Sequence, residues 1–170
     1  DAVFSTLNKW IKNEDVVLFS LHALSTWLEK DVERAKLEIQ ALLNIHLVVL
    51  DAARRHGRNV ILVSKALSIF VSLPDEVLSG KELTLSLGTS LADLLMSSHE
   101  HGTHVVWQLG AACLARVLSL VAHNLTEWRV SDGLQKLMLR LVQTVQRNAS
   151  HWEVVHILQL IASFRVVLLP

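Results

Sequence analysis

Apolar residues recur every three or four positions along almost the whole chain, with very few turn-forming residues between them. The 170 residues contain only two Pro and six Gly, whereas a β-rich chain needs turn signals at intervals of roughly 8–12 residues. No segment shows the sustained two-residue alternation of a half-buried strand. The sequence therefore predicts an all-α fold.

Turn signals divide the chain into about eight predicted helices. They cover residues 2–11, 16–29, 31–56, 59–73, 81–98, 103–123, 134–147 and 150–170, with one short turn between Pro74 and Gly80. Every second helix begins near residue 15, 59, 103 or 150, a period of roughly 44–47 residues that is typical of helical repeats. We therefore expect a single repeat domain over 1–170, cut from a longer chain, with units 1–30, 31–74, 75–123 and 124–170.

A weak internal similarity accompanies this period. Residues Val16–Ser20 read VVLFS and residues Val60–Ser64 read VILVS. The helix pairing resembles that of the HEAT and armadillo repeat superfamily, and Val105–Ala115, VVWQLGAACLA, is similar to the inner helix of an armadillo unit. The resemblance implies an α-solenoid of about four helical pairs that binds other proteins. The alternative that the pattern leaves open is a compact bundle of seven or eight helices.

The resemblance departs from one armadillo subgroup, the nuclear-import receptors. In those proteins an Asn one turn after a Trp helps to grip the backbone of an extended peptide. Here Trp107 is followed four residues later by Ala111, and Trp27 by Asp31. The chain lacks this pattern, so we do not expect import-receptor peptide recognition.

The charges of the chain balance, because 16 Lys and Arg face 16 Asp and Glu. A net charge of zero removes the general attraction that a strongly basic protein has for nucleic acids or anionic membranes. The single cysteine, Cys113, excludes a disulfide framework and a zinc site built from two or more cysteines of this chain. We expect a protein of the cytoplasm or nucleus.

One predicted helix, 134–147, divides cleanly into an apolar and a polar side. An apolar stripe that recurs at i, i+3, i+4 and i+7 is expected to face the core, and it consists of Leu134, Leu137, Met138, Leu141, Val142 and Val145. The opposite side carries a basic row, which Trp152 extends at the start of the next helix. The residues of this predicted partner-binding surface are Lys136, Arg140, Gln143, Arg147 and Trp152. Cationic side chains one turn apart suit an acidic segment of a protein partner.

A second basic patch follows the apolar part of the predicted helix 31–56. It consists of Arg54, Arg55 and Arg58, with His56 between them. Two separate basic patches are also what a solenoid lying along a phosphate backbone would present. A nucleic-acid-associated solenoid is therefore the alternative function, and binding of a partner protein is the preferred one.

Candidate catalytic and metal-binding residues are few. The segment 99–104, HEHGTH, is similar to the His-x-His-x-x-His motif of metallo-β-lactamase-like hydrolases, but Thr103 takes the place of the usual Asp, and the predicted helices do not supply the β-sandwich around it. Cys113 lies among small apolar residues, where a thiol is inert. We expect no catalysis, no metal and no cofactor.

The longest apolar segment, Val105–Ala122, is the best candidate for a membrane span. It contains Gln108 and Arg116, and an Arg near the centre of a span is costly. We therefore expect no membrane span. The last apolar run, Val166–Leu169, is expected to be covered by further repeats or by a partner, because the outer face of a terminal repeat is normally polar.

Overall fold

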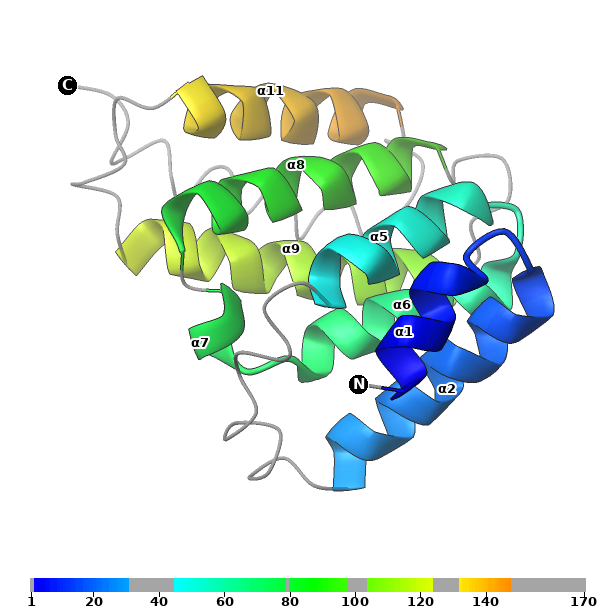
Figure 1. Ribbon diagram of the computed structural model, residues 1–170. Helices are drawn as coiled ribbons and strands as arrows, with labels where there is room; N and C mark the ends of the chain where they lie inside the picture. The colour runs from blue at the N-terminus through cyan, green and yellow to red at the C-terminus, as the bar shows by residue number, and fades with distance from the viewer. Residues whose placement is uncertain (1, 31–44, 79, 98–103, 124–131, 148–170) are drawn as a thin grey trace, which may run out of the picture. The chain divides into compact units, whose positions relative to one another are not determined.

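The computed structural model describes residues 2–30, 45–78, 80–97, 104–123 and 132–147. The chain divides into two compact units, residues 1–78 and 79–170. The first unit contains α1 (Ala2–Lys9), α2 (Glu14–Lys30), α5 (Ile45–Arg55), α6 (Val60–Ser72) and the short α7 (Asp75–Leu78). The second contains α8 (Lys81–Ser97), α9 (His104–His123) and α11 (Asp132–Arg147) (Figure 1).

All of these elements are helices, so the predicted all-α class is confirmed for the described residues. Most predicted helices begin and end within about two residues of the observed bounds, as expected where polar caps mark the ends. The first part of the predicted helix 31–56 and all of the predicted helix 150–170 lie outside the described residues. The boundary between the units falls close to residue 74, where the sequence places the end of the second repeat. The single repeat domain stays a prediction.

In the first unit, α1 packs against α2 and α5 packs against α6, which makes two helical hairpins. The hairpins contact each other through α1 with α5 and through α2 with α6. Asn13 and Asn59 begin the second helix of each hairpin, where their side-chain oxygens accept hydrogen bonds from the backbone N–H of Val16 and Leu62. The buried side chains of the first unit include Leu7, Val17, Leu21, Leu24, Leu28, Val49, Leu62, Ala66, Leu67 and Phe70.

The turns of the two hairpins are joined by a small polar network, which we call the turn junction. His56 donates a hydrogen bond from Nε2 to the carbonyl oxygen of Ile11 at 2.8 Å. Its Nδ1 lies 3.6 Å from one carboxylate oxygen of Glu14, whose other oxygen accepts from Asn59 at 2.6 Å. Because both turns lie at the same end of the unit, α1 runs parallel to α5 and α2 runs parallel to α6.

In the second unit, α8 packs against α9 and against α11 (Figure 1). Two glycines allow these helices to approach closely. A Cβ at Gly110 of α9 would lie 2.5 Å from a methyl group of Leu95, and one at Gly88 of α8 would lie 2.8 Å from Leu137 and 2.9 Å from Val117. Gly88 therefore occupies a position where all three helices meet.

These contacts also fix the directions of the helices. Leu95 meets Gly110 while Gly88 meets Val117, so α9 runs antiparallel to α8. By contrast, Gly88 meets Leu137, and further along both helices the hydroxyl oxygen of Thr144, which donates to the carbonyl oxygen of Arg140 at 2.8 Å, also lies 3.3 Å from the carbonyl oxygen of Ala92. α11 therefore runs parallel to α8, as α5 does to α1 in the first unit.

We expect Gly110→Ala to lower the free energy of unfolding by up to about 2 kcal/mol. The added methyl group collides with the fully buried Leu95, an overpacking cost of about 1–3 kcal/mol, and the better helix propensity of Ala returns only about 1 kcal/mol. In a Leu95→Ala background, which removes the collision, the same substitution should be neutral or stabilising. Urea unfolding of the four variants measures this, and equal effects in both backgrounds would contradict the contact.

Candidate functional site

The predicted basic row lies on α11, whose position is set by its contact with α8. The side chains of Leu137, Leu141 and Thr144 are buried against the rest of the second unit. On the other side Lys136 and Arg140 are exposed and Gln143 is half-buried. The structure therefore places these three residues on the side of the helix away from its buried stripe. The side chain of Arg147 and the whole of Trp152 lie outside what the structure describes.

Arg140 takes part in an interaction that the sequence does not predict. Its Nε lies 3.3 Å from a carboxylate oxygen of Asp93 in α8, and its Nη1 donates to the side-chain oxygen of Gln143 at 3.1 Å. Both charged side chains are partly exposed, so this pair contributes at most about 1 kcal/mol to stability. The two contacts direct the Arg140 guanidinium toward Asp93 and Gln143.

Two exposed apolar residues lie beside the basic row. Leu139 is 59% exposed and Val142 is 40% exposed. The sequence pattern assigned Val142 to the apolar series of this helix together with Leu141, and it gave no role to Leu139. We call the five residues Lys136, Leu139, Arg140, Val142 and Gln143 the α11 outer face. Spacing alone could not separate Val142 from the buried series, because its neighbours at i−1 and i+2 are both buried.

The second predicted basic patch lies in the first unit. Arg54 and Arg55 form the last turn of α5, and Arg58 lies in the turn before α6. All three are exposed. The Nε of Arg55 contacts Asp51 at 2.8 Å, which reduces the positive charge of this patch. The two basic patches belong to different units of the chain.

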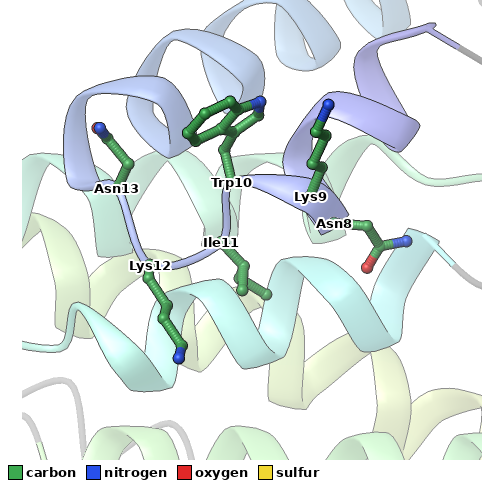
Figure 2. Close-up of a pocket in the computed structure, with 6 residues that line it drawn as sticks. All are labelled: Asn8, Lys9, Trp10, Ile11, Lys12 and Asn13. Atoms are coloured by element: carbon green, nitrogen blue, oxygen red, sulfur yellow. The ribbon is translucent and has the colours of Figure 1, made fainter.

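A hollow of about 620 Å³ lies at the turn between α1 and α2. Figure 2 shows the residues that line it, which are Asn8, Lys9, Trp10, Ile11, Lys12 and Asn13. The ammonium group of Lys9 lies 5.7 Å from the centroid of the Trp10 ring, within the range of a cation–π contact. Lys9 and Lys12 point in opposite directions in this view. The two ammonium groups do not converge on one position in the hollow, so together they do not form an anion-binding site.

Of the predicted histidine cluster, only His104 belongs to the described residues, and it is exposed at the start of α9. Across the described ranges there is no group of three or more His, Cys, Asp or Glu side chains that could hold a metal ion. Cys113 is buried, and this burial raises the pKa of its thiol to about 12. A thiol with this pKa carries almost no thiolate at neutral pH, which makes it a poor nucleophile.

The apolar helix α9 contains a window, His104–Val121, with a mean hydropathy of 1.5 and a length sufficient to cross a membrane. Half of this window is buried inside the protein, partly against α8 through Gly110 and Val117. Core helices of folded proteins have the same composition. The expectation that the chain has no membrane span stays a prediction.

His46 is a buried titratable residue that the sequence did not single out. It lies in α5 with 2% exposure, and neither ring nitrogen has a hydrogen-bond partner among the described residues. Burial lowers the pKa of His46 below its ordinary value of 6.5, because desolvation disfavours the charged ring. A signal was present in the sequence, since His46 falls among the apolar residues Ile45, Leu47 and Val48.

Comparison with known proteins does not assign this chain to a family. No protein-family model, no curated protein and no solved structure matches the chain.

We expect His46 to make the protein less stable as the pH falls below about 6.5. The unfolded chain takes up a proton at His46 near pH 6.5, whereas the folded chain does so only at lower pH, so acid favours unfolding. The free-energy difference between the unsubstituted chain and His46→Leu should therefore shift in favour of the variant between pH 7.5 and 5. Parallel pH profiles from urea unfolding would contradict this account.

Proposed function

We propose that this chain is a non-catalytic scaffold that binds a partner protein through the surface of a HEAT- or armadillo-like α-solenoid. The orientation of its hairpins supports the solenoid. In the first unit α1 and α5 are parallel neighbours, as are α2 and α6, and in the second α8 and α11 are parallel neighbours. Stacked repeats have this arrangement, because each hairpin covers the apolar side of the one before it.

The observation that carries the binding function is the α11 outer face. One side of α11 is anchored on α8 by buried contacts, while Lys136, Arg140 and Gln143 remain on the outside. A basic row on a firmly packed helix can bind acidic groups with little loss of conformational entropy. The partner we propose is a protein with an acidic segment, in the cytoplasm or nucleus.

The alternative is a solenoid that contacts the phosphates of a nucleic acid. The exposed Arg54, Arg55 and Arg58 favour it. Two observations weigh against it: the net charge of the chain is zero, and Arg55 and Arg140 each contact an acidic residue of the chain. We therefore keep protein binding as the proposal. The covering of Val166–Leu169 by further repeats or by a partner also stays a prediction, because this segment lies outside the described residues.

The solenoid makes a testable prediction for small-angle scattering. Four helical pairs stacked in one direction should give a radius of gyration clearly above roughly 15 Å, the value expected for a compact globule of this length. A compact bundle should give the globular value. A monomeric sample with a radius of gyration near 15 Å would count against the solenoid.

The binding function can be tested by capture on the immobilised chain. We expect proteins to be retained from cell extract after nuclease treatment, and we expect cross-links from them to include α11. A mixed-sequence single-stranded RNA should not bind measurably at physiological salt. If nuclease treatment removes all retained protein, and RNA binds directly with an affinity that declines steeply with salt, the nucleic-acid alternative is correct.

A further inference from the structure

We propose that the α11 outer face is the docking surface for one kind of partner segment, a short acidic amphipathic helix. This inference rests on the proposed function and adds the shape and chemistry of the ligand. It starts from the exposed apolar residues Leu139 and Val142, which the basic row alone does not explain.

The exposed side of α11 is divided lengthwise into two strips. Successive residues of a helix are about 100° apart around its axis. Leu139 and Val142 therefore lie on one flank, and the uncharged Gln135 and Gln146 lie on the same flank, between them around the axis. Lys136, Arg140 and Gln143 lie on the other flank. A partner that follows α11 therefore meets an apolar strip and a basic strip at the same time.

The basic strip is able to bind carboxylates. Lys136 is exposed and makes no ion pair or hydrogen bond with any residue in the described part of the chain. Arg140 uses Nε on Asp93 and Nη1 on Gln143, but a guanidinium has five N–H donors, so some remain for a second acceptor. Asp93 repels an acidic group on its own side of Arg140. Lys136 has no such acidic partner among its described contacts, so it is the more favourable partner for an incoming carboxylate.

An amphipathic helix fits this division better than an extended peptide. Neighbouring side chains of a strand point to opposite sides, so an extended segment presents a single row of side chains, at i, i+2 and i+4, to the surface and covers only one of two parallel strips. A helix with apolar residues at i, i+3 and i+7 carries its acidic residues on an adjoining flank. Both flanks then meet their counterparts on α11. The strips extend over about two turns, which matches a segment of two to four turns.

The docking surface is held in place by the packing beneath it. Leu137 fits against Gly88, and the Thr144 hydroxyl contacts the carbonyl oxygen of Ala92. The exposed residues between them, Leu139 and Val142, consequently belong to a helix whose position is already set. Binding requires no rearrangement of α11, and the ordering cost falls mainly on the partner segment.

The test uses the full chain and a synthetic peptide of about four helical turns, with Leu at i, i+3 and i+7 and Glu on one adjoining flank. A second peptide has the same composition in an order that has no stripe. We expect saturable binding of the striped peptide in fluorescence anisotropy, and binding weaker by about tenfold or more for the unstriped one. Lys136→Glu and Leu139→Ser should each weaken binding by about tenfold.

Matched controls come from the other unit. Leu47 in α5 is 55% exposed, close to the value for Leu139, and Lys12 is exposed in the turn before α2. Leu47→Ser and Lys12→Glu should change the affinity by less than about twofold. Unchanged melting temperatures for all four variants exclude unfolding as the cause. Lys136→Glu should also reduce the salt dependence of binding, whereas Leu139→Ser should leave it unaltered.

Three results would overturn the inference. The first is equal affinity for the striped and unstriped peptides. The second is the same effect of the α11 variants and their controls. The third is RNA that displaces the peptide in a manner that depends on Lys136 but not on Leu139. Failure of the peptide to bind, together with nuclease-resistant capture of proteins on another helix, would reject this docking surface and leave the scaffold function standing.

Discussion

The helices in the described part of this chain have apolar sides that a single helical hairpin cannot bury by itself, and the rest of the structure depends on this constraint. In the first unit the stripe of α2 that includes Val17, Leu21 and Leu28 is covered by α6 of the next hairpin. In the second, α8 is covered on one side by α9 and on another by α11. Burial of this kind supplies most of the free energy that stabilises helices in water.

The burial of apolar side chains does not by itself determine how neighbouring helices are oriented. Polar contacts between the helices favour one orientation over the others. At the turn junction, His56 reaches the carbonyl group of Ile11, and Asn59 reaches Glu14. In the second unit, the hydroxyl oxygen of Thr144 lies 3.3 Å from the carbonyl oxygen of Ala92, and Leu137 packs against Gly88 earlier in the same helix pair. Reversing a hairpin would remove these contacts between helices, and a buried polar group that loses its partner costs about 1–3 kcal/mol.

The same packing explains why some reactive or titratable side chains are buried while other polar and apolar side chains are exposed. Cys113 and His46 are buried, so their environments favour the neutral thiol and the neutral ring. Lys136 and Leu139 are exposed because they lie opposite the stripe by which α11 packs on α8. The surface that we propose for binding is therefore a direct consequence of which side of α11 packs against α8.

The secondary structure of the chain could be predicted from its sequence. Helical periodicity, together with polar caps such as Asn13 and Asn59, determined the class of fold and most helix bounds, because these depend on interactions within about four residues. The placement of Lys136 and Arg140 on the outside of α11 followed from the same periodicity.

Other features were decided only by the tertiary structure. The contact of Arg140 with Asp93 joins residues far apart in sequence, and no local pattern specifies it. Spacing also assigned Val142 to the apolar series of α11, yet it is exposed, because the width of the buried stripe depends on how closely α8 approaches. That approach is set by Gly88, whose importance appears only when Leu137 and Val117 are brought against it. Sequence periodicity determines which residues share a helix face, and long-range packing decides how much of that face is covered.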